Sequence, residues 1–385
     1  MRGGVLAIAL VLAIALSSGP SLAASEHPPP PPPPPPSLSL PIRGMTIGPI
    51  ESAVHPGLGY GSEAYGRALD ESRRMGATWV ALTPFGRVAN LKGRGIDPTF
   101  ERPFEENRRD IARAIDMAHE RGLRVMLVPH LWVESGEWRA LIDPGTNEGW
   151  AEWERSYTTF VRTWAEVAEA TQVDLFSCGV ELRSWVTSGR APGFLRVIRE
   201  VRKTYHGPIT YSANWDDVDD TMVLGEIDVI GINAFYPLAE SDSAPFSKLL
   251  DGGKRVAERA RTLSQIWNKS ILFTEIGYTT RPNPAIKPWE WPDHMKHVRV
   301  DQRAQAEAYS ALIAPQLDEP SFAGFFVWRT YSDPDDVSQE AEWGFSPRGK
   351  LAELVLRDAF SARWVTDLDK LWGHAPRARV AGVYP

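Results

Sequence analysis

Two glutamates, Glu181 and Glu275, each end a short apolar stretch of the sequence. Glu275 lies in residues 271–278 (ILFTEIGY), and Glu181 lies in residues 175–182 (LFSCGVEL). Apolar runs of this length are typical of buried parallel strands. Glutamate is rarely buried without a partner, so burial alone does not explain a carboxylate at the same end of both runs. Such a pair can perform acid–base and nucleophilic chemistry, whereas a separate salt bridge from each to an arginine is the alternative.

The segments that must position these glutamates alternate between strand-like and helix-like patterns. Expected strands cover residues 44–49, 78–85, 124–133, 175–182, 209–214, 229–235, 271–278 and 322–331. Expected helices cover residues 62–75, 106–121, 149–170, 192–205, 246–267, 302–316 and 350–360, with a short fifth connection at 218–224. Eight such units predict an α/β fold, a single (β/α)8 TIM barrel. An open doubly wound sheet is the alternative, but the glycine-rich phosphate loop that usually follows its first strand is missing.

Polar and aromatic residues follow the expected strands, where a barrel of this kind builds its active site. Aromatic faces stack on sugar rings, and polar side chains bind the hydroxyl groups, so we expect a polysaccharide or oligosaccharide substrate. Trp132 and Trp328 are expected in a sugar platform rather than in the core, and Tyr236 is expected to hydrogen-bond Glu275. The full set of expected substrate-binding residues is His130, Trp132, Asn214, Trp215, Asn233, Tyr236, Tyr278, Trp328 and Arg329.

The sequence argues against several other kinds of site and partner. A net charge of -7 disfavours nucleic acid and anionic membrane surfaces as partners. No HExxH motif or Asp-rich metal loop occurs, and His294 and His297 belong to a Pro- and Trp-rich insertion, so no metal or other cofactor is expected. A G-x-S-x-G nucleophile motif is also missing, and the single cysteine, Cys178, is expected to be a small buried hydrophobe.

The two ends of the sequence predict export of the chain. Residues 1–24 combine Arg2, an apolar run and small residues before a cleavage position, which is typical of a secretory signal peptide. Residues 25–40 contain an unbroken proline tract that predicts an extended linker. The catalytic domain is expected at residues 41–362 and a tail at 363–385. We therefore expect a secreted or periplasmic monomer without a membrane span in its mature form.

Several segments together resemble one enzyme family. VALTPF, VMLVPHLWV, CGVELRSW, IGINAFYPL, FTEIGYTT and FVWRTY, spread over residues 44–360, are similar to glycoside hydrolase family 113, the β-mannanase family. The resemblance implies a retaining endo-hydrolase of β-1,4-linked mannan, with Glu181 as acid/base and Glu275 as nucleophile. Many members of the wider clan have Asn directly before the acid, where this chain has Val180. The contact that this Asn makes with the sugar 2-hydroxyl must then come from elsewhere, with Asn214 and His130 as candidates.

Two other functions are compatible with a barrel of this composition. A catalytically silent carbohydrate-binding barrel would keep the aromatic cleft, and an envelope scaffold would use the proline tract as a spacer. Neither needs both Glu181 and Glu275, so their joint presence favours the enzyme.

Overall fold

The computed structural model describes residues 38, 40–50, 55–99, 102–242, 244–291, 298–336 and 339–361. The predicted signal peptide, the proline tract, the tail, His294 and His297 lie outside the described residues. The domain boundaries stay predictions for that reason.

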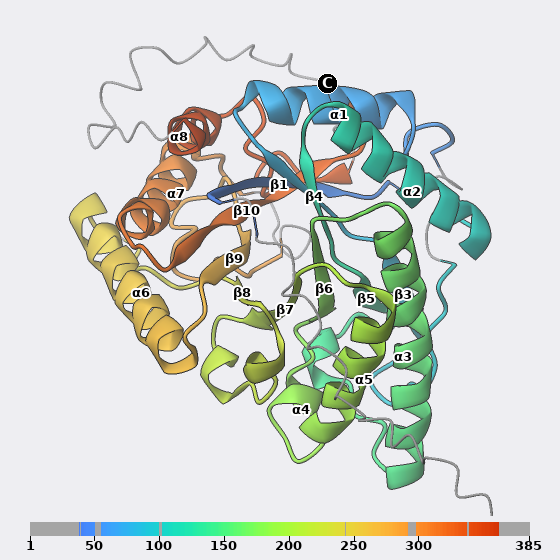
Figure 1. Cartoon of the computed structure of the whole chain (residues 1–385). Helices are drawn as coiled ribbons and strands as arrows, with labels where there is room; N and C mark the ends of the chain where they lie inside the picture. Colours follow the sequence, from blue (N-terminus) through green and yellow to red (C-terminus); the bar gives the residue numbers. More distant parts are fainter. Residues whose placement is uncertain are drawn as a thin grey trace, which may run out of the picture. The chain divides into compact units, whose positions relative to one another are not determined.

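Eight parallel strands close into a barrel, and helices surround it (Figure 1). Around the barrel, the order is β1-β10-β9-β8-β7-β6-β4-β2, and β2 pairs with β1 to complete the ring. The predicted TIM barrel is therefore confirmed. The barrel strands are β1 (Ile42–Gly48), β2 (Trp79–Leu82), β4 (Arg124–Leu127), β6 (Leu175–Val180), β7 (Ile209–Asn214), β8 (Val229–Asn233), β9 (Ile271–Ile276) and β10 (Phe322–Tyr331).

Two of the predicted strands are longer in the sequence than in the barrel. Residues 78–85 and 124–133 each divide at a proline, Pro84 and Pro129, which has no N–H to continue a strand ladder. The pieces beyond the prolines, β3 (Phe85–Val88) and β5 (His130–Val133), form a separate parallel pair. His130 is the first residue of β5 in this pair.

The helices follow the predicted alternation. The fifth connection is indeed short, with only the 3-10 turns η2 (Val218–Asp220) and η3 (Leu224–Glu226). Ser62 caps the first helix by accepting a hydrogen bond from the backbone N–H of Tyr65 at 3.1 Å. Apart from the turns η2 and η3, the helical elements are α1 (Glu63–Arg74), α2 (Phe104–Glu120), η1 (Arg139–Leu141), α3 (Asn147–Ala170), α4 (Arg183–Val186), α5 (Ala191–Thr204), α6 (Phe246–Trp267), α7 (Gln302–Leu317) and α8 (Leu351–Phe360).

Two clusters make up most of the hydrophobic core of the described residues. A large cluster, which includes Cys178, packs the outer faces of the strands against the helices. A smaller cluster comes almost wholly from the strands and includes Trp79 and Phe326, whose rings meet edge to face at 6.3 Å. Gly44 makes room for the Phe326 ring, because a Cβ at this position would lie 2.1 Å from it. The barrel is therefore filled by side chains below its mouth.

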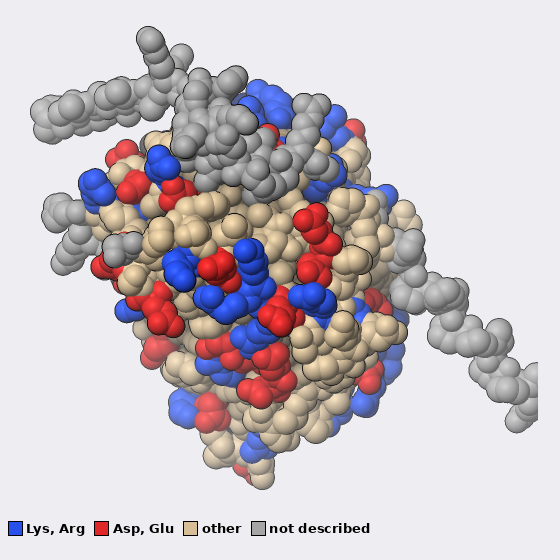
Figure 2. Space-filling model, turned by 90° about the vertical axis from the view of Figure 1, so that its left-hand side faces the viewer, with Lys and Arg blue, Asp and Glu red and all other residues tan. Residues whose placement is uncertain are grey.

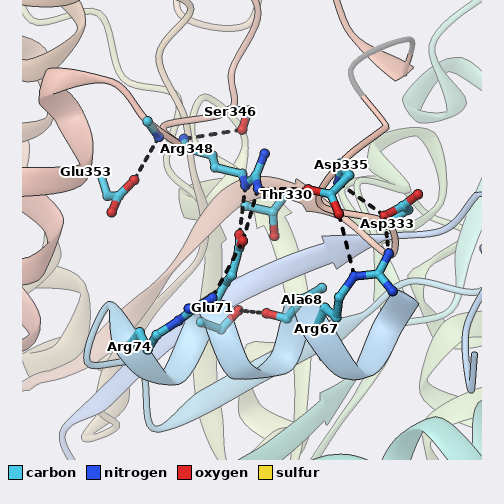
Figure 3. A network of polar contacts seen from close by, with 12 residues as sticks. Arg67, Ala68, Glu71, Arg74, Thr330, Asp333, Asp335, Ser346, Arg348 and Glu353 are labelled. Carbon is cyan, nitrogen blue, oxygen red and sulfur yellow. Dashed lines mark hydrogen bonds and ion pairs between the residues drawn. The ribbon is translucent and has the colours of Figure 1, made fainter. Parts of the chain in front are cut away.

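An ionic network joins the first helix to the segment between β10 and α8 (Figure 3). Arg348 binds Glu71 of α1 through two hydrogen bonds of 2.7 and 3.0 Å. Arg67, also on α1, contacts Asp333 at 3.1 Å. A surface depression beside this network is lined by residues of α1 together with Pro334 and Asp335. These contacts tie the beginning of the barrel to its end.

The surface drawn in Figure 2 carries positive and negative side chains side by side rather than a large patch of one sign. Such a surface does not provide the continuous basic face that a nucleic acid requires. Among the described residues, no helix combines the length and apolarity needed to cross a bilayer.

Candidate active site

Both glutamates lie at the carboxyl ends of barrel strands and are buried. Glu275 belongs to β9, Glu181 directly follows β6, and each residue is 6% exposed. The backbone of Glu181 has φ 51°, a left-handed conformation that is uncommon outside glycine. Its N–H donates to the Ser212 carbonyl on β7 at 2.9 Å, which holds this conformation in place. Residues kept in such conformations cluster at functional sites.

One amide brings the two carboxyl groups together. Asn233, the last residue of β8, donates from Nδ2 to Glu181 Oε1 at 2.9 Å, and its side chain also hydrogen-bonds Glu275. The Thr274 hydroxyl donates to Asn233 Oδ1 at 2.9 Å and so fixes which way the amide points. Asn233 also lies in register with Glu275 on the neighbouring strand β9. This arrangement suits two carboxyl groups acting on one bond.

The surroundings of Glu275 favour its neutral form on balance. Burial, and next the charge of Glu181, raise the pKa of Glu275 to about 8. Its Oε1 lies 3.3 Å from Nε2 of His130. Burial lowers the pKa of His130 to about 3, so this imidazole is neutral and has a single N–H.

The proton on His130 can be placed from its second contact. Nδ1 lies 2.8 Å from the Val128 carbonyl, which only accepts hydrogen bonds, so Nδ1 carries the N–H. Nε2 is then an acceptor, and the hydrogen in its contact with Glu275 must come from the carboxyl group. The geometry and the raised pKa agree that Glu275 is protonated in the free protein near neutral pH.

Glu181 is surrounded by donors instead. Trp138 Nε1 donates to Glu181 Oε2 at 2.8 Å, and the Arg139 guanidinium contacts the same oxygen at 3.1 Å. Neither residue was predicted from the sequence. Both come from the connection between β5 and α3, several residues beyond the strand end, and the sequence offers no pattern that marks them.

Aromatic residues form one wall of the site. Trp328 stacks on His130 with ring centroids 6.0 Å apart, and it packs in a small cluster with Phe235 and Phe345. The Arg329 guanidinium lies 4.8 Å from the Trp328 ring centroid. Trp215 packs against the same cluster and stacks on Trp289, whose residue surface is 47% exposed. This wall therefore runs from the buried centre to the surface.

The structure corrects the expectations for three other residues. Tyr278 is fully buried against Tyr309, and Tyr236 packs in the core beside Trp215 and Phe273, so neither lines the site. Tyr236 forms no hydrogen bond with Glu275 in the described part of the chain; His130 and Asn233 take that place. Trp328 is only 6% exposed, so it is part of a packed cluster and not a free platform.

Two of the predicted substrate-binding residues make their contacts away from the two glutamates. Asn214 is buried, and its amide donates to Asp216 Oδ1 at 2.6 Å. Trp132 is 46% exposed on β5, in the small β3–β5 sheet outside the barrel. Asn233 is therefore better placed than Asn214 for a contact beside the carboxyl pair. Within the described ranges, no group of three or more His, Cys, Asp or Glu side chains could hold a metal ion.

Comparison with known proteins agrees with this geometry. The family model described as Glycoside Hydrolase Family 113 matches residues 58–350. A family 113 β-mannanase from Alicyclobacillus acidocaldarius, solved in complex with ManMIm, is 26% identical with a TM-score of 0.71, covering 84% of this chain and 98% of that one. A family 113 β-1,4-mannanase complex is 23% identical with a TM-score of 0.70, covering 84% and 99%. No curated protein matches the chain. Because the family model covers most of the barrel, the chain belongs to Glycoside Hydrolase Family 113.

Proposed function

We propose that this protein is an exported enzyme that hydrolyses β-1,4-linked mannan by double displacement, with retention of anomeric configuration. The observation that carries the proposal is the carboxyl pair of Glu181 and Glu275, joined through Asn233 in a family 113 barrel. The similarity to a structure named as a β-mannanase supports the choice of mannan. The signal-like sequence of residues 1–24 supports export.

In the first step, Glu275 attacks the anomeric carbon while Glu181 protonates the leaving oxygen, which gives a covalent glycosyl-enzyme. In the second step, Glu181 removes a proton from water, and the water displaces Glu275. The first step needs Glu275 ionised and Glu181 protonated. Glu275 is protonated in the free protein near neutral pH, so it must lose this proton, and Glu181 must carry one, when the bond breaks. Arg139 and Arg329, whose charges lower the pKa of Glu275, favour that loss.

The wall of aromatic residues supports a polymeric substrate. Trp215 and Trp289 continue from the packed Trp328 cluster to the surface, where the exposed face of an aromatic ring can stack on a sugar ring.

Incubation with a panel of β-linked polysaccharides tests the function directly. Wild type should release reducing ends from β-1,4-mannan faster than from cellulose or xylan, and E275A should lose this activity. E105A, which changes an exposed glutamate on α2, is the matched control and should behave as wild type. Mannan binding without hydrolysis would instead support a silent carbohydrate-binding barrel. Preferred hydrolysis of another glycan would overturn the choice of substrate.

A further inference from the structure

The connection between β5 and α3 supplies Glu181 with a built-in cationic partner. Trp138 Nε1 and the Arg139 guanidinium both meet Glu181 Oε2, while Asn233 donates to Oε1. The Arg139 and Glu181 side chains are 18% and 8% exposed, so water screens this pair weakly. Three donors on one carboxyl group match the ionised form, which accepts hydrogen bonds at both oxygens.

Other contacts hold these two donors in place. Arg139 also donates to the Leu131 carbonyl at 3.4 Å. The Trp138 ring lies 4.8 Å below the Arg183 guanidinium, and Arg183 is itself paired with Asp216 and Asp217. The Trp138–Arg139 pair is therefore a fixed part of the site and not a chance surface contact.

We propose that Trp138 and Arg139 are positioning residues that hold Glu181 as a carboxylate, the form that it needs as the general base of the second step. This inference rests on the proposed function, because it concerns the acid/base of that reaction. The same contacts oppose the protonated form that Glu181 needs in the first step. Arg139 thus favours the second step of the reaction and disfavours the first.

The charged surroundings give the direction of the effect. The charge of Arg139 lowers the pKa of Glu275 and also the pKa of His130. Replacing Arg139 therefore removes positive charge from the surroundings of both carboxyl groups. An opposite charge at this distance typically lowers a carboxyl pKa by about 1–3 units. The groups that would still face the pair are Arg329 from β10, His130 from β5, Tyr211 from β7 and Asp217, whose pKa burial raises to about 6.

R139M is the central variant, and R139K keeps the charge. With manno-oligosaccharides, which have poor leaving groups, R139M should move the alkaline limb of kcat/KM up by about one pH unit, a roughly tenfold gain above that limb. With an activated aryl β-mannoside, whose second step limits the rate, the acidic limb of kcat should also move up by about one unit. The rate at low pH would then fall roughly tenfold. W138F, which removes one donor, should shift both limbs less, and R139K should remain near wild type.

Opposite changes at the two ends of the pH range separate this role from a merely structural one. R94M changes an exposed arginine paired with Glu152, and it should leave both limbs in place. An unshifted R139M profile, or equal losses at every pH, would overturn the proposal. If R139M fails to fold by circular dichroism, R139Q replaces it.

A readout without substrate keeps this test independent of the proposed function. In protein labelled with 13C at the glutamate carboxyl carbon, the Glu181 signal should titrate at higher pH in R139M than in wild type. The same titration point in both proteins would contradict the proposed role of Arg139. A wild type inactive on every glycan would refute the proposed function alone, and the titration would still decide whether Arg139 holds Glu181 ionised.

Discussion

At the scale of single residues, the contact between Glu275 and His130 has the clearest physical consequence. A neutral imidazole that donates to Val128 needs a protonated carboxyl partner, and burial raises the pKa of Glu275 to about 8. The folded protein therefore binds a proton on Glu275 that the unfolded chain releases above its ordinary pKa of 4.5. Folding stability from this group is present at low pH and is lost as the pH rises from 4.5 through 8.

Replacing Glu275 by Gln should remove this pH dependence. The Gln amide can still donate to His130 Nε2, but it never ionises. E275Q should match wild type near pH 5 and exceed its free energy of unfolding by about 2 kcal/mol or more at pH 9. His130, whose pKa is lowered to about 3, opposes folding below about pH 6.5 in both proteins, so its effect cancels from the difference between them. Urea unfolding at each pH checks the prediction, with E105Q as control; parallel curves for E275Q and wild type would contradict it.

The two strand-end tryptophans should respond differently to truncation. Trp328 is buried against Phe235 and Phe345, so W328A should lower the free energy of unfolding by about 3–5 kcal/mol and also reduce activity. Trp132 is half exposed, and W132A should change stability by less than about 0.5 kcal/mol. Denaturant unfolding and kcat/KM on mannan measure both effects. A wild-type stability for W328A would restore the expectation of a free sugar platform.

At the scale of elements, the segments that could be predicted are those that bury one face. The apolar runs of β6 and β9 locate Glu181 and Glu275, because a buried strand needs continuous apolar residues whatever surrounds it. The split at Pro84 and Pro129 was missed, although proline is a known ladder breaker. Trp138 and Arg139 could not be predicted, because the path of the connection between β5 and α3 depends on tertiary contacts such as the cation–π pair with Arg183.

The link between α1 and the segment after β10 makes a modest, measurable contribution. Arg348 forms a bidentate pair with Glu71, but both side chains are about a third exposed, so solvent screens the interaction. R348A should lower the free energy of unfolding by about 0.5–1 kcal/mol at low salt and by less at high salt. Arg74 lies 3.6 Å from the same carboxylate and is mostly exposed, so R74A is the matched control. An equal loss for both variants would mean that the bidentate geometry adds nothing.

At the scale of the whole molecule, the barrel does what no single element can. It brings strands separated by almost a hundred residues to one mouth, where Asn233 of β8 contacts the carboxyl groups that follow β6 and end β9. The alternation of strands and helices was enough to predict this meeting, because barrel topology dictates which strand ends share a face. Which carboxyl group holds the proton at rest was not predictable, since it depends on His130, Arg139 and burial together.

The most direct test of the account is the configuration of the products formed with azide by E275A and E181A from an activated aryl β-mannoside. If Glu275 is the nucleophile, azide takes its place in E275A and gives the α-mannosyl azide, with inverted configuration. If Glu181 is the acid/base, E181A still forms the glycosyl-enzyme, and azide releases it as the β-mannosyl azide, with retained configuration. Proton NMR distinguishes the two adducts. Exchanged configurations would reverse the two roles, and wild-type activity in either variant would contradict catalysis by this pair.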